Sequence, residues 1–370
     1  MNKSILVFLI STAIVFSFGV IMVFNTTSAE VLNKSLEVST HSGLIKQLIY
    51  AFIGLSLGVC VFIIGYEKIL KMSPLLLGLC VLTLILVFVP KIGQSINGAK
   101  RWIGFAKYTI QPSEFAKYII PMFFIYKKTE TYSIDFVTFI KILTILSIPI
   151  LLILLEPDTG STIIILTTFI AVFFLTRIKV LYWGVPLLVL FLVGATLAYN
   201  MNHVRNRITV YMHPERDIKG KGHQPYQAKI AVGSGKFMGR GLGESLQKLD
   251  YLPEARNDYI AAIYAEETGF LGISVLVALY LSMAVSGFYI ASKSIDKRGF
   301  YLASLITFLI SFQAFLNLGV VSNLLPSKGV TLPFFSQGGT SLIVNIIGVS
   351  LLISIAAKNR KKWENIKEKS

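Results

Sequence analysis

Charged residues are scarce in this chain of 370 residues: only 15% are Asp, Glu, Lys or Arg, whereas 54% are hydrophobic. This scarcity excludes a soluble globular domain, because the surface of such a protein would be far too apolar. The chain is therefore predicted to be a polytopic integral membrane protein.

Cysteine and histidine are also rare, with two and four residues respectively. Cys60 and Cys80 both fall in apolar runs, without a CxxC spacing or a nearby histidine, so neither a metal site nor a structural disulfide is indicated. The histidines are too far apart in the chain to form a recognisable metal site; they are His41, His203, His213 and His223. No metal site is predicted.

Apolar runs near the length that crosses a bilayer recur along the chain. They lie at about 5–25, 45–66, 72–90, 113–126, 136–155, 160–176, 180–199, 269–292, 299–322 and 338–357. The first is roughly 20 residues long, beyond the core of a signal peptide, so it is expected to stay as a span. The predicted fold is an all-α membrane protein with about ten transmembrane helices, forming one domain over residues 1–370.

An even number of spans places both ends of the chain on one side of the membrane. The tail, residues 358–370, carries six basic and two acidic residues, which marks that side as cytoplasmic. The segments then predicted to lie outside are 26–44, 91–112, 156–160, 200–258 and 323–337.

Acidic residues are outnumbered by basic ones, 19 against 35, which gives a net charge of +16. In a soluble protein this excess of basic residues would suggest that the partner is a nucleic acid. Here much of it lies in short loops and in the tail, where basic residues set the orientation of the protein in the membrane. The segment 200–258 differs, because it is long, lies outside and holds ten basic residues against six acidic ones. Loops of this length translocate largely regardless of charge, so the topology stands. Its positive charge predicts an anionic ligand at the outer face.

The glycine-rich segment 233–243 fits neither standard phosphate-binding template. A P-loop needs Ser or Thr after its Gly-Lys, where Phe237 follows Lys236, and a dinucleotide fingerprint needs glycine where Met238 stands. Its glycines would still let backbone amides approach a phosphate, with Lys236 and Arg240 neutralising the charge. A flexible surface loop explains the segment equally well, and both interpretations stay open.

Glu114 and Lys117 lie three residues apart on one face of a span that Pro112 begins. An ionisable pair inside a membrane is by default functional, although a structural pair that locks two helices together is the competing interpretation. In the tight turn 156–160, Glu156 and Asp158 would by themselves be interpreted as helix-capping and turn residues.

Four carboxylates gather where the long polar segment gives way to the eighth span; they are Glu254, Asp258, Glu266 and Glu267. Arg256 should favour the ionised form of Asp258, which a general base requires, and an N-cap role for this aspartate is compatible with that chemistry. The proline- and glycine-containing loop 325–341 carries one charge, Lys328, which could reach an anionic headgroup.

Several separated motifs resemble the SEDS proteins (shape, elongation, division, sporulation), the bacterial peptidoglycan polymerases, and the resemblance covers nearly the whole chain. These motifs are Gly98-Ala-Lys-Arg-Trp102, Gln111-Pro-Ser-Glu-Phe-Ala-Lys117, Pro157-Asp-Thr-Gly160, Lys229-Ile-Ala-Val-Gly-Ser-Gly235, Leu252-Pro-Glu-Ala255 with Asp258, Glu266-Glu267, and Leu332-Pro-Phe-Phe-Ser336 with Gly338-Gly339.

The segments 241–249 and 325–329 resemble the division branch of the family, FtsW, more than the elongation branch, RodA. Two positions depart from the family pattern: Arg256-Asn257 replaces the usual His-Thr, and Gln337 replaces the tyrosine of the usual Ser-Tyr-Gly-Gly. These departures leave the geometry around the acceptor open, while Asp258 itself is present.

The resemblance implies a glycosyltransferase that polymerises lipid II, a disaccharide-pentapeptide on undecaprenyl pyrophosphate, with inversion and release of the lipid pyrophosphate. It leads to the hypothesis that Asp258 is the general base. The candidate pyrophosphate ligands are Arg101, Lys117, Lys236, Arg240 and Lys328. The acids expected to organise the cavity by pairing with cations are Glu114, Asp158, Glu254, Glu266 and Glu267. No nucleotide cofactor is expected, and a divalent cation, Mg or Mn, is left open.

Two other functions stay open beside the polymerase. A lipid II flippase would also use charges inside the membrane, and a scaffold would activate a partner transpeptidase through helix contacts. Within the family the implied partners are a class B penicillin-binding protein, other division proteins and membrane lipid, and no nucleic acid. The implied location is the bacterial cytoplasmic membrane, at the division septum for the FtsW branch.

Overall fold

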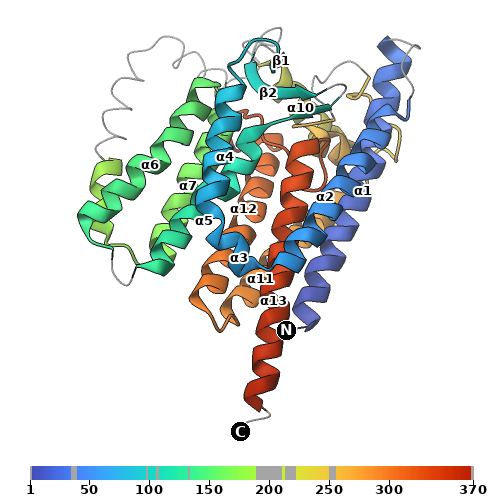
Figure 1. Cartoon of the computed structure of the whole chain (residues 1–370). Coiled ribbons are helices and arrows are strands. Elements are labelled where there is room, and N and C mark those ends of the chain that lie inside the picture. The colour runs from blue at the N-terminus through green and yellow to red at the C-terminus, as the bar shows by residue number, and fades with distance from the viewer. Residues whose placement is uncertain are drawn as a thin grey trace.

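The computed structural model describes residues 2–34, 40–96, 99–105, 108–131, 134–188, 211–212, 222–249 and 256–367 (Figure 1). Within these residues, six helices are long and apolar enough to cross a membrane, and two shorter apolar helices accompany them. The predicted helical membrane fold is therefore confirmed.

Most of the helices contain one of the predicted spans, because each span is one apolar run between polar segments. They are α1 (Asn2–Lys34), α2 (Ser42–Ile64), α3 (Tyr66–Lys71), α4 (Ser73–Leu86), α5 (Pro112–Glu130), α6 (Phe136–Leu155), α7 (Thr159–Leu175), α10 (His223–Ser234), α11 (Ile260–Ser292), α12 (Lys297–Val321) and α13 (Gly339–Lys367). Residues 180–188 are also helical, and the rest of the predicted span 180–199 lies outside the described residues.

Local signals at the helix ends explain several of these boundaries. Pro112 occupies the first turn of α5, where its missing N–H costs nothing. Asp158 caps α7 by accepting a hydrogen bond from the amide of Ser161. Asp296 caps α12 in the same way, through the amide of Arg298.

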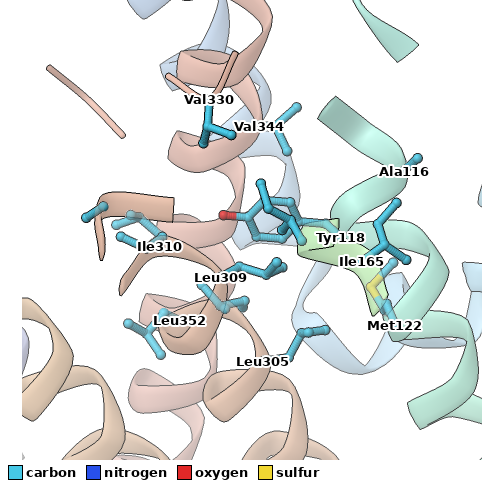
Figure 2. Packing of buried hydrophobic residues seen from close by; sticks show 14 of the residues in the cluster. Ala116, Tyr118, Met122, Ile165, Leu305, Leu309, Ile310, Val330, Val344 and Leu352 are labelled. Carbon is cyan, nitrogen blue, oxygen red and sulfur yellow. The ribbon is translucent and has the colours of Figure 1, made fainter. Parts of the chain in front are cut away.

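α12 and α13 form the centre of the helix bundle. Their apolar windows are 67% and 72% buried, whereas those of α1, α2, α6 and α11 are only 22–28% buried. The outer helices therefore present apolar side chains outward, as expected for a protein surrounded by lipid. Tyr118 of α5, Leu309 of α12 and Val344 of α13 belong to the buried core that joins the central helices (Figure 2).

A small antiparallel sheet stands in the predicted outer segment 91–112. Its strands are β1 (Gly93–Ile96), β2 (Ala99–Phe105) and β3 (Tyr108–Ile110), in the order β1-β2-β3. Both described ends of the chain lie at the opposite end of the bundle (Figure 1). This arrangement agrees with an even number of crossings, and the cytoplasmic assignment of the ends stays a prediction.

α11 begins earlier than its predicted span, at Ile260 rather than at 269. Its first turns contain Glu266 and Glu267, which lowered the hydropathy of the segment although both side chains are buried. A kink at Gly269, where φ is 68°, separates this polar part from the apolar remainder. Glycine is needed there because the backbone of the 236–239 segment packs directly against it.

Candidate active site at the sheet-bearing end of the bundle

Asp258 lies two residues before the start of α11 and is half-buried. Its backbone carbonyl accepts a hydrogen bond of 2.8 Å from Nδ2 of Asn317 on α12. Its carboxylate lies against the backbone of Gly329, since a Cβ atom added to that glycine would be 3.3 Å from Asp258 Oδ2. The start of α11 and the loop after α12 therefore meet at this carboxylate.

The loop 325–330 is held in place by contacts on both sides of Gly329. Asn317 Nδ2 also donates to the carbonyl of Val330, at 2.7 Å, and the hydroxyls of Tyr259 and Ser327 lie 2.9 Å apart. Lys328 is half-buried within this loop. The predicted base and the predicted cation Lys328 thus belong to two segments in direct contact.

Arg101 on β2 holds the turn between α6 and α7. Its Nε and Nη2 atoms donate to the carbonyls of Glu156 and Pro157, at 3.1 and 2.6 Å, and Nη1 lies 4.0 Å from Asp158 Oδ1. The same turn touches the loop 325–330, because a Cβ atom on Gly160 would be 3.3 Å from the carbonyl oxygen of Gly329. The segments of Arg101, Asp158, Lys328 and Asp258 therefore form one continuous site.

Asp158 is buried and saturated with hydrogen bonds. Oδ2 accepts from Ser113 Oγ at 2.7 Å and from Gln111 Nε2 at 3.1 Å, while Oδ1 caps α7. The capping role inferred from the turn is therefore combined with a link to the start of α5. The role of Asp158 as an acid that organises the cavity stays a prediction.

Glu156 contrasts with this neighbour. It is fully buried, and neither carboxyl oxygen has a hydrogen-bond partner among the described residues. Burial, together with the nearby Asp158 carboxylate, raises the pKa of Glu156 to about 8, against the opposing effect of Arg101. The carboxyl beside Arg101 is therefore neutral at pH 7.

Lys117 and Glu114 lie inside the bundle rather than at the surface of the site. Their side chains form an ion pair of 2.7 Å, and the Lys117 ammonium also donates to Gln313 Oε1 of α12 at 3.2 Å. Lys117 is only 2% exposed. The pair thus joins α5 to α12, which supports the structural interpretation left open by the sequence, and its role toward a ligand stays a prediction.

Glu266 and Glu267 anchor the glycine-rich region to α11. Glu266 accepts from Ser245 Oγ at 2.5 Å, from two backbone amides at 3.3 Å each, and from Arg240 Nη1 at 3.3 Å. Glu267 pairs with Lys248 at 2.9 Å and accepts from Asn25 Nδ2 of α1 at 2.8 and 2.6 Å. Each acid thus pairs with one basic residue, and the role of both acids in organising the cavity stays a prediction.

The backbone of the 233–243 segment packs against the polar part of α11. The amides of Arg240 and Gly241 donate to the carbonyls of Glu266 and Glu267, at 3.0 Å each. These two amides are therefore committed to the protein itself, so this part of the segment is not a phosphate cradle. Lys236 is exposed, and the proposal that Lys236 and Arg240 bind phosphate stays a prediction.

Sequence reasoning missed four polar residues that hold the site together: Asn25, Lys248, Gln313 and Asn317. Gln313 and Asn317 gave a usable signal, because buried amides four residues apart on an otherwise apolar span must find partners within the bundle. Glu254 lies outside the described residues. Among the described residues, no three His, Cys, Asp or Glu side chains converge on a metal site, and a divalent cation remains a prediction.

Comparison with known proteins gives consistent matches along the chain. Residues 5–361 match the model of the FtsW/RodA/SpoVE cell cycle proteins. A protein of Legionella pneumophila, named probable peptidoglycan glycosyltransferase FtsW, is 37% identical over 87% of this chain and 83% of its own length. A Geobacter metallireducens protein of the same name is 36% identical over 95% of this chain and 94% of its own.

Solved structures show the same fold. A chain from a peptidoglycan synthase complex that coordinates polymerisation and crosslinking superposes with a TM-score of 0.77, at 24% identity, covering 95% of this chain and 97% of its own. The rod shape determining protein RodA of Thermus thermophilus gives a TM-score of 0.68 at 24% identity, covering 95% of this chain and 96% of its own.

Proposed function

The chain belongs to the FtsW/RodA/SpoVE family of cell cycle proteins, and from this membership we propose that it is a peptidoglycan glycosyltransferase of the division type. It polymerises lipid II into glycan strands at the outer face of the cytoplasmic membrane. Relatives named FtsW that are 36–37% identical over most of the chain support this activity. The sequence prediction of an FtsW-type member agrees with these names.

The observation that carries the mechanism is the contact of the Asp258 carboxylate with the loop 325–330, beside the turn held by Arg101. The acceptor 4-hydroxyl bonds to the anomeric carbon of the donor, and its proton passes to Asp258. The bond from that carbon to the phosphate oxygen breaks, and the electron pair leaves with the lipid pyrophosphate. A neutralised pyrophosphate is a good leaving group, so one base and nearby cations suffice without the second carboxylate that a glycosidase needs.

The proposed cations differ in how the structure places them. Lys328 lies on the loop that meets Asp258, and Arg101 holds the turn that touches this loop, so we assign these two cations first to the pyrophosphate. Lys117 and Arg240 each pair with a buried glutamate, and Lys236 lies on the exposed loop beyond α10. A phosphate contact by Lys117 or Arg240 would compete with these pairs.

The proposal extends to a partner and a location. A class B penicillin-binding protein would crosslink the glycan strands, and the related chain from a peptidoglycan synthase complex supports such a pairing. Assembly with other division proteins at the septum follows from the division-type assignment.

The test is polymerisation of lipid II in proteoliposomes by the purified protein with its cognate penicillin-binding protein, whose transpeptidase is blocked by a β-lactam. Wild type is expected to make glycan chains and Asp258→Asn none, while a sample with the partner alone shows the background. Equal polymerisation by wild type and Asp258→Asn would remove the aspartate from the mechanism. Absence of glycan together with transfer of lipid II across the bilayer would replace the polymerase with a flippase.

A further inference from the structure

Asn317 of α12 was not among the residues that the sequence singled out, yet it touches both halves of the site. Its side chain is 1% exposed, and its single amide nitrogen donates to the carbonyls of Asp258 and Val330. These carbonyls belong to segments that are far apart in the sequence. One planar amide group therefore joins the backbone of the proposed base to the backbone of the loop that the base faces.

The Asp258 carboxylate and the loop 325–330, which Asn317 joins, lie close together. No Cβ atom fits easily on Gly329, because it would come within 3.3 Å of the Asp258 carboxylate, and the carbonyl of Gly329 lies equally close to the Cβ position of Gly160. Because glycine has no Cβ atom, these two positions allow the three segments to approach closely. Val330, the residue beside Gly329, anchors the loop in the same buried core as Val344 (Figure 2).

We propose that Asn317 is a positioning residue for Asp258: its two hydrogen bonds fix the distance and orientation of the carboxylate relative to the loop 325–330. This inference rests on the proposed role of Asp258 as general base. The side-chain amide of asparagine carries two donor hydrogens on one nitrogen atom, so it can bind both carbonyls from one position on α12. α12 is a rigid support for this amide because the helix lies in the buried centre of the bundle. Displacing a reacting group by about 1 Å costs on the order of 10²-fold in rate.

The experiment compares Asn317→Ala, which has no donor, and Asn317→Ser, which has one, with a matched control. Asn345 of α13 is an asparagine of the same burial with two hydrogen bonds, to Tyr118 and Ser341, and Asn345→Ala is the control. Polymerisation is measured against lipid II concentration, per folded molecule, together with the melting temperature of each variant.

The expected result is a fall in kcat of about 10²-fold for Asn317→Ala, with an intermediate value for Asn317→Ser and KM within threefold of wild type. Asn345→Ala should lower the melting temperature comparably while keeping kcat within threefold. Wild-type kcat in Asn317→Ala, an equal loss in Asn345→Ala, or a change in KM alone would overturn the proposal. These outcomes are distinct from failure of the proposed function, which an active Asp258→Asn would reveal and which would overturn both.

Discussion

Asp258 and the pair Glu266–Glu267 belong to the same sequence cluster, but the structure gives them different environments. Glu266 and Glu267 are fully buried, and their oxygens are occupied by Arg240, Lys248, Asn25 and the loop that follows α10. Asp258 is half-buried, and its carboxylate lies against the backbone of Gly329, where the start of α11 meets the loop 325–330. Fully buried carboxylates that are saturated with donors hold the fold together, whereas a partly exposed carboxylate can be reached by a substrate hydroxyl.

The largest effect on stability is expected from Glu267→Ala. This change removes the only acid paired with the nearly buried ammonium of Lys248 among the described residues, which leaves this charge with the neutral acceptors Asn25 Oδ1 and the Gly243 carbonyl. It also removes the acceptor of the Asn25 amide, and breaking a buried ion pair costs about 3–5 kcal/mol. We expect a lower free energy of unfolding in detergent, measured by denaturant titration. The double variant Glu267→Ala with Lys248→Met should recover part of the loss, and no recovery would mean that the pair itself contributes little.

A smaller effect, on catalysis, is expected from Arg101→Lys. The lysine keeps the charge but cannot donate in a fork to the carbonyls of Glu156 and Pro157. The turn that touches Gly329 would loosen, so we expect polymerisation to fall about tenfold, equivalent to about 1.4 kcal/mol. The comparison is sharpened by Arg240→Lys, which alters a cation away from Asp258; an equal loss there would contradict the assignment.

Gly329→Ala should reduce the polymerisation rate several-fold, because the added methyl group meets the Asp258 carboxylate at 3.3 Å. The matched control is Gly78→Ala, since a Cβ atom at Gly78 meets no atom within 4 Å. Both variants are assayed for glycan synthesis at saturating lipid II. Equal polymerisation rates in the two alanine variants would show that the close packing of Gly329 against Asp258 does not affect catalysis.

A separate effect, on the pH dependence of stability, is expected from Glu156. Its pKa is raised to about 8 in the fold from a usual 4.5, so the folded state binds a proton that the unfolded chain releases between these values. The contribution of Glu156 therefore favours folding at low pH and is lost progressively as pH rises from about 4.5 to 8. Glu156→Gln should flatten the change in melting temperature over this range and be the more stable protein at pH 8. An unchanged pH dependence in this variant would contradict a neutral Glu156.

Much of this architecture follows from the sequence because hydropathy alone defines a membrane span. The apolar runs at 136–155 and 299–322 match α6 and α12 almost residue for residue. The start of α11 was misjudged because Glu266 and Glu267 look like loop residues until their buried partners are known. The sheet at 93–110 was also missed, since short strands outside the membrane carry a weak signal.

The candidate site was predictable in its parts but not in its assembly. Asp258, Arg101 and Asp158 are identified by motif resemblance, whereas their convergence depends on tertiary contacts such as that between Gly160 and Gly329. The spacing of Gln313 and Asn317 indicates that both amides need partners within the bundle, but it cannot show that the partners of Asn317 are two carbonyls contributed by distant segments.

The most direct measurement of the central claim is the rate of lipid II polymerisation per folded molecule for Asp258→Asn beside Glu267→Gln. The difference between the two environments predicts that Asp258→Asn loses about 10²–10⁴-fold in rate at an unchanged melting temperature. Glu267→Gln is expected to melt earlier and to polymerise at nearly the wild-type rate. The reverse pattern, with Asp258→Asn active and Glu267→Gln stable but inactive, would contradict the account.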